Sequence, residues 1–167
     1  GAAGVQGLPG SPSGGPAIRG AVSESEFLAQ HRAGIMQELQ DPAKREAFMG
    51  LMQAETGSQG PEAQRAWAET TIDRWAARGE SVERGIASNY FGNNPRYRQP
   101  SQAMRDQYPA LMDRIGKGSA LYPGATGNAS DQPGNYVLSG HRRRGEVAGE
   151  INKEGFIYEP HPRDRAF

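Results

Sequence analysis

The feature that most constrains the fold is a pair of consecutive helices with clear start and stop signals. Asp41-Pro42 is a typical helix start, because an Asp side chain caps free backbone N–H groups and proline fits the first helical position. Gly57 is expected to end this helix. Pro61 then starts a longer helix, which Gly79 stops. The sequence therefore predicts two packed helices joined by a short polar turn.

Glu55 stands at the end of the first of these helices. Phe48, Leu51, Met52 and Glu55 recur at helical spacing, so Glu55 lies on or beside the apolar stripe. A carboxyl group there is partly removed from water, which raises its pKa and lets it hold a proton near neutral pH. Several sugar-cleaving folds present a general acid in this way. The alternative is an ordinary solvated glutamate at a helix end.

The longer helix has apolar residues on two faces, one with Trp67 and the other with Trp75. We therefore expect it to be a central helix that packs on both sides, with both tryptophans in the core. Capping residues and apolar spacing predict three further helices, over about residues 24–40, 82–87 and 101–116.

The last third of the chain is expected to carry a small β element. Residues 136–139 and 156–158 are short strand candidates that could pair as a hairpin, and residues 116–135 are expected to be loop. Pro109 is expected to kink or divide the helix before this loop. Arg142–Arg144 form a basic run, which we interpret as a solvated turn.

Composition excludes several classes of protein. The 167 residues contain no cysteine, which excludes disulfides and Cys-ligated zinc, and 19 basic residues balance 19 acidic ones. Neutrality gives no general attraction to nucleic acid, and no apolar run is long enough to span a membrane. We expect a flexible Gly/Pro-rich linker over residues 1–20, one domain over 21–160 and a tail over 161–167, with no metal or cofactor.

Aromatic and amide side chains gather in the stretch from Ser88 to Gln102. Tyr90 and Tyr97 stand there among asparagines and arginines. Rings beside amides suit the faces and hydroxyls of a sugar chain. An ordered loop held in place by its aromatic residues explains the same composition.

The stretch MGLMQAETGSQGPEAQRAWAETTIDRWAARG, from Met49 to Gly79, resembles the opening motif of cell-wall hydrolases of the spore-cortex-lytic type. In that family a helix ends in Ala-Glu and a short glycine-bearing turn, and an Ala-rich helix follows and ends near an Asn-Arg pair. The matching residues are Ala54-Glu55, Gly57 to Gly60, Ala63 to Ala68 and Asp73-Arg74. Asp73 departs from the usual Asn. The resemblance is good over residues 45–80, loose over 81–160 and absent from 1–40.

This resemblance implies a mainly α-helical fold with a small β-hairpin, an α+β fold of lysozyme-like outline with a cleft between the two parts. It also implies cleavage of the bond between N-acetylmuramic acid and N-acetylglucosamine in peptidoglycan by a single acid–base residue, Glu55. In a lytic transglycosylase the 6-hydroxyl of the muramic acid closes a 1,6-anhydro ring, so no second carboxylate is required. If hydrolysis by two carboxylates operates instead, Glu62 and Glu69 are the candidates for the second acid.

Polar and aromatic residues near the proposed acid are candidates for substrate binding, although a structural hydrogen bond explains each of them equally well. They are Thr56, Ser58, Gln59, Tyr90, Tyr97, Asn135, Tyr136 and His141. The expected partners are peptidoglycan strands at the bacterial cell wall, and other domains or subunits of a larger assembly. The Gly/Pro-rich start, the missing start Met and the missing signal sequence suggest a delivered protein such as a phage virion component. The competing hypothesis is a non-enzymatic structural or assembly protein of lysozyme-like shape.

Overall fold

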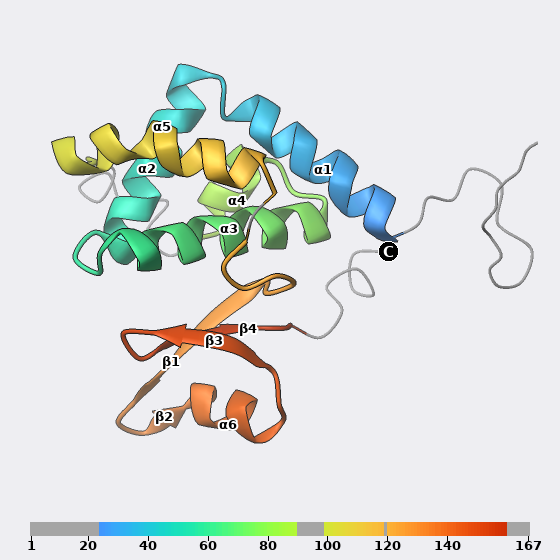
Figure 1. Cartoon of the computed structure of the whole chain (residues 1–167), viewed down its shortest axis with the longest axis vertical. Coiled ribbons are helices and arrows are strands. Elements are labelled where there is room, and N and C mark those ends of the chain that lie inside the picture. Colours follow the sequence, from blue (N-terminus) through green and yellow to red (C-terminus); the bar gives the residue numbers. More distant parts are fainter. Residues whose placement is uncertain (1–23, 90–98, 119, 160–167) are drawn as a thin grey trace, which may run out of the picture.

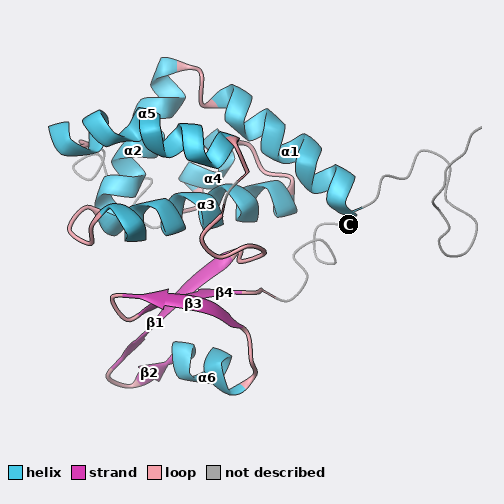
Figure 2. Ribbon diagram, viewed as in Figure 1, coloured by secondary structure: helices cyan, strands magenta, loops and turns pink. Residues whose placement is uncertain are grey.

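The computed structural model describes residues 24–89, 99–118 and 120–159. Within these ranges the chain has a mainly helical α+β fold with one small antiparallel sheet (Figure 1, Figure 2). The helices are α1 (Glu24–Glu38), α2 (Pro42–Thr56), α3 (Pro61–Arg78), α4 (Val82–Ala87), α5 (Gln102–Gly116) and α6 (Val137–Arg143). The strands are β1 (Gly127–Gln132), β2 (Asn135–Tyr136), β3 (Val147–Ile151) and β4 (Glu154–Ile157).

The helix boundaries follow the capping signals of the sequence. The Asp41 carboxylate accepts a hydrogen bond from the backbone N–H of Lys44 at 3.1 Å, and Ser81 and Ser101 cap α4 and α5 in the same way. Gly79 ends α3 in the left-handed conformation, with φ of 66°, which costs glycine little. The predicted pair α2 and α3 is confirmed.

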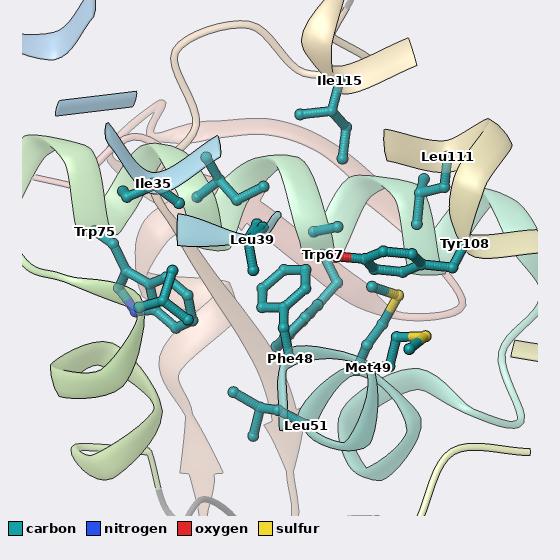
Figure 3. Close-up of a cluster of buried hydrophobic side chains, with 14 of the residues drawn as sticks. Ile35, Leu39, Phe48, Met49, Leu51, Trp67, Trp75, Tyr108, Leu111 and Ile115 are labelled. Atoms are coloured by element: carbon teal, nitrogen blue, oxygen red, sulfur yellow. The ribbon is translucent and has the colours of Figure 1, made fainter. Parts of the chain in front are cut away.

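α3 is the central helix of the helical part, as predicted. Trp67 and Trp75 are both buried, and the ring of Phe48 lies 5.6 Å from the first and 5.7 Å from the second, between ring centroids (Figure 3). Leu39, directly after α1, and Tyr108 from α5 also belong to this core. Both tryptophans are therefore core residues and not sugar-stacking platforms.

α5 is one uninterrupted helix with Pro109 inside it, so Pro109 does not divide it. Met104, Tyr108, Leu111 and Ile115 recur at helical spacing and are all buried against the other helices. An interior proline costs about 3 kcal/mol. Burial of four large side chains, each of which contributes about 1.5–3 kcal/mol, exceeds that cost.

The sheet has the strand order β2-β1-β4-β3, with antiparallel pairs throughout. The predicted strand at residues 156–158 is largely confirmed by β4, but the predicted strand at 136–139 is wrong, since residues from 137 onward form α6. The predicted loop over 116–135 is also wrong, because it contains β1. β4 pairs with β1 on one side and with β3 on the other, so the hairpin forms from β3 and β4.

The two faces of β4 contact different layers of the molecule. Phe156 packs against Ala66 of α3, while Ile157 packs against Leu138 of α6. A side chain at Gly155 would lie 2.2 Å from Leu138, so glycine is required where α6 crosses the strand. Because alternate residues share a face, Glu154 projects from the same face as Phe156, toward the helices. Figure 1 shows this sheet between the helical part and α6.

Candidate active site

Glu55 is the second-last residue of α2 and is half-buried. Burial raises the pKa of its carboxyl, and the negative charge of Glu154 raises it further. A hydrogen bond with Asn89 and the positive charge of Arg74 act in the opposite direction, and the net effect is a raised pKa. The sequence-based expectation for the pKa of this carboxyl thus agrees with its surroundings in the fold.

A second carboxyl group, Glu154 of β4, interacts electrostatically with Glu55, and we call Glu55, Glu154, Asn128 and Arg74 together the cluster. Its Oε2 accepts a hydrogen bond of 2.7 Å from Nδ2 of Asn128 on β1. Oδ1 of Asn128 in turn accepts a hydrogen bond of 3.4 Å from the Arg74 guanidinium on α3. Burial raises the pKa of Glu154, and the hydrogen bond from Asn128 partly offsets this. The cluster joins the end of α2, the C-terminal part of α3 and the two central strands.

Arg74 supplies the positive charge at this junction. Its guanidinium also donates to the Thr71 hydroxyl at 3.4 Å, on the same helix. Burial lowers the pKa of Arg74, whereas the carboxylates of Glu159, Glu55 and Glu80 favour its charged form. The side chain stays cationic because an arginine pKa lies far above neutrality. The arrangement combines a carboxyl whose pKa is raised by burial, a second carboxyl and a cation in a half-buried site.

The turn after Glu55 contacts the sheet through its backbone more than through its side chains. The Thr56 side chain is buried, and its hydroxyl donates to the Met52 carbonyl at 2.8 Å. Ser58 is exposed. Gln59 donates to the Glu55 carbonyl at 3.5 Å, and its own carbonyl accepts from Asn152 in the β3–β4 turn at 3.0 Å. Of these three candidates, Ser58 has the most accessible side chain.

The other substrate-binding candidates lie away from Glu55 or outside the described residues. Asn135 and Tyr136 form β2 and are exposed, with Tyr136 64 % exposed. His141 lies in α6, where Nδ1 is 2.8 Å from the Glu146 carboxylate. Figure 1 shows β2, at the edge of the sheet, and α6 together at the end of the molecule away from α2. Tyr90 and Tyr97 lie outside the described residues.

Neither sequence-based candidate for the second acid joins the cluster. Glu69 is buried, where it binds Arg65 and the backbone N–H of Leu121 at 3.0 and 2.9 Å. Glu62 is exposed at the start of α3. Asp73, the departure from the family motif, forms an ion pair with Arg32 of α1, so it ties two helices together.

Sequence reasoning missed Glu154 and Asn128 because both belong to strands whose partners are distant in the chain. Glu154 and Asn128 are 26 residues apart, and Asn128 and Arg74 are 54 apart. A weak signal was present: in the run Glu-Gly-Phe-Ile, Glu154 shares the period-2 face of the apolar Phe156, and a carboxyl on an apolar face is unusual.

Within the ranges that the structure describes, no helix is long and apolar enough to cross a membrane, and no group of three or more His, Asp or Glu side chains could hold a metal ion. A hollow of about 820 Å³ lies elsewhere, between α1, α2 and α5. Comparisons with models of protein families, with curated proteins and with solved structures gave no match to this chain.

Proposed function

We propose that this chain is a peptidoglycan-cleaving glycosidase of the lytic transglycosylase type, with Glu55 as its acid–base residue. The observation that carries the proposal is the half-buried Glu55 carboxyl, whose pKa is raised by burial at the junction of α2, α3 and the sheet. A general acid needs a proton at the operating pH, and burial of a carboxyl favours its protonated form. Asn89 orients the same carboxyl by a hydrogen bond.

The proposed reaction needs one proton donor that becomes a proton acceptor. Glu55 donates its proton to the glycosidic oxygen while the bond from that oxygen to the anomeric carbon of N-acetylmuramic acid breaks. Positive charge develops on the anomeric carbon. The Glu55 carboxylate then takes the proton of the 6-hydroxyl, whose oxygen bonds to that carbon and closes the 1,6-anhydro ring. Glu55 ends the cycle protonated, as it began.

The choice of substrate rests on the resemblance of residues 45–80 to the spore-cortex-lytic hydrolases. A lysozyme-like outline is part of the same proposal, supported by a helical part and a small sheet that meet at Glu55. We further propose that the protein acts at the bacterial cell wall as part of a larger assembly, such as a phage particle.

Digestion of purified peptidoglycan tests the function. The parent chain, Glu55→Gln and the control Glu62→Gln are incubated with peptidoglycan, and released muropeptides are identified by mass spectrometry. We expect 1,6-anhydro-muropeptides from the parent and the control, and none from Glu55→Gln, while circular dichroism shows all three folded. Glu62 is the matched control because it is an exposed glutamate on the adjacent helix.

Two results would contradict this proposal. Equal release by Glu55→Gln and the parent would remove Glu55 from the chemistry. No release by a folded parent chain would favour the structural or assembly role, in which the fold binds a glycan or a neighbouring subunit without cutting it.

A further inference from the structure

We propose that Glu154 is a second catalytic carboxylate of this site, whose negative charge stabilises the positive charge that develops on the anomeric carbon. This inference rests on the proposed function and departs from a mechanism with a single glutamate. It gives β4 a chemical role in addition to its structural one.

Glu154 projects from the side of the sheet that faces the helices. Glu154 lies opposite Ser130 of β1 and Ile151 of β3, so it occupies a central strand of the ladder. It shares the helix-facing side with Phe156, which packs on α3. On that side the Glu154 carboxyl interacts electrostatically with Glu55. A carboxylate pair contributed by a helix end and a sheet can face one substrate from two directions.

A hydrogen bond holds the Glu154 carboxyl in place. Asn128 is its hydrogen-bond partner among the described residues, through Nδ2 at 2.7 Å. The orientation of that amide is set from the other side, because Oδ1 of Asn128 accepts from Arg74, which can only donate. The amide therefore presents its N–H to Glu154. A donor aimed at a carboxyl group favours the ionised form, which only accepts.

Several charged side chains surround Glu55 and Glu154. Arg74 from α3 carries the positive charge facing Glu55. Arg78 pairs with Glu159 at 3.5 Å after β4, and the Glu80 carboxylate adds negative charge near Arg74. Glu150 and Asp131 bind Arg142 on the α6 side. Burial raises the pKa of both carboxyls, but the Asn128 hydrogen bond favours the ionised form of Glu154, and the negative charge of Glu154 raises the pKa of Glu55 further. This difference in surroundings assigns the charged role to Glu154 and the proton to Glu55.

The role of Glu154 is electrostatic and adds no covalent step. When Glu55 protonates the glycosidic oxygen, positive charge spreads over the anomeric carbon and ring oxygen. A fixed carboxylate beside that carbon lowers the energy of this transition state more than that of the neutral substrate, so it raises kcat. The proton still passes from the 6-hydroxyl to Glu55, and the charge of Glu154 is the same before and after.

The test compares the pH dependence of peptidoglycan cleavage by the parent, Glu154→Gln and Glu150→Gln. Glu150 is the matched control, since it lies four residues away on β3 and pairs with Arg142 on the opposite side of the sheet. We expect Glu154→Gln to lower kcat on the order of 10²–10³-fold, as the loss of one preorganised electrostatic group does. Glutamine can still accept the Asn128 hydrogen bond, so the variant should fold.

The pH profile separates a catalytic role from a structural one. In the parent, activity should fall at low pH, as Glu154 gains a proton, and at high pH, as Glu55 loses one. Glu154→Gln should lose the low-pH fall and keep the high-pH one. Asn128→Ala removes the hydrogen bond that lowers the pKa of Glu154, so its low-pH fall should move to higher pH. A merely structural residue would change the rate and leave the profile unmoved.

The outcomes distinguish failure of this inference from failure of the proposed function. A parent that releases nothing from peptidoglycan refutes the function itself. If Glu55→Gln is inactive while folded Glu154→Gln keeps the rate and profile of the parent, the function stands and the role of Glu154 is overturned. If the parent releases reducing-end muropeptides, water attacks the sugar, and the transglycosylase step of the proposed function is refuted.

Discussion

Removal of the Glu69 carboxylate should cost the fold about 3 kcal/mol. Glu69 is buried in α3, where Oε2 accepts from Nε of Arg65 at 3.0 Å and Oε1 from the backbone N–H of Leu121 at 2.9 Å. Hydrogen bonds to a charged group contribute about 1.5–3 kcal/mol each. We take the lower value for both, because Arg65 and Leu121 are half-buried and water can replace part of each interaction. Two bonds at about 1.5 kcal/mol give about 3 kcal/mol.

Urea unfolding followed by circular dichroism would measure this loss in Glu69→Ala. The control is Glu62→Ala, an exposed glutamate in the first turn of the same helix, which should lose about 0.5 kcal/mol through the helix dipole. Glu69→Gln should lie between them, because an amide oxygen can still accept from Leu121. If Glu69→Ala and Glu62→Ala unfold at the same urea concentration, with equal dependence of the unfolding free energy on urea, then Glu69 does not stabilise the loop that leads to the sheet.

Three further changes test other parts of the fold. Because burial raises the pKa of Glu55, ionisation of this carboxyl destabilises the folded state. The stability gained by Glu55→Gln should therefore be absent at low pH, grow as the pH rises from the unfolded-state pKa to the raised folded-state pKa, and then level off. A gain in stability that is independent of pH would contradict this. Gly155→Ala should cost about 1–3 kcal/mol by overpacking, and Leu138→Ala in the same chain should recover part of it, which thermal unfolding of the single and double variants would show. Arg32→Met should lower the free energy of unfolding by about 1.5–3 kcal/mol, because Arg32 pairs with Asp73 and also donates to a backbone carbonyl of α5. A double-mutant cycle with Asp73→Asn measures the coupling between the two side chains, and additive losses would refute that coupling.

The helical part could be predicted from sequence because its signals are local. Asp41, Ser81 and Ser101 each cap a helix within three residues of themselves, and Gly79 stops α3 in a conformation that glycine adopts readily. The apolar spacing in α2 placed Glu55 beside the core, and its surroundings in the fold confirm a raised pKa. All of these inferences depend on residues that lie within about one helical turn of each other.

The sheet could not be predicted because its strands lack the usual apolar alternation. β1 reads Gly-Asn-Ala-Ser-Asp-Gln, and its pairing depends on β4, which lies far along the chain. In the opposite direction, Tyr136-Val137-Leu138 has strand-forming residues, yet Leu138 is buried on the sheet from within a helix. Tertiary packing overrides propensity in both segments. Glu154 and Asn128 were missed for the same reason, since only the pairing of β1 with β4 brings them together.

The position of β4 in the chain bears on when the site can form during synthesis. β4 pairs with both β1 and β3, yet it is the last strand along the described chain to leave the ribosome. Translation at about 5–20 residues per second releases α2 and α3 several seconds before β4. A nascent chain thus carries Glu55 on its helix well before Asn128 and Glu154 can pair. Any chemistry that needs both carboxyl groups therefore begins only after nearly the whole described chain has been made.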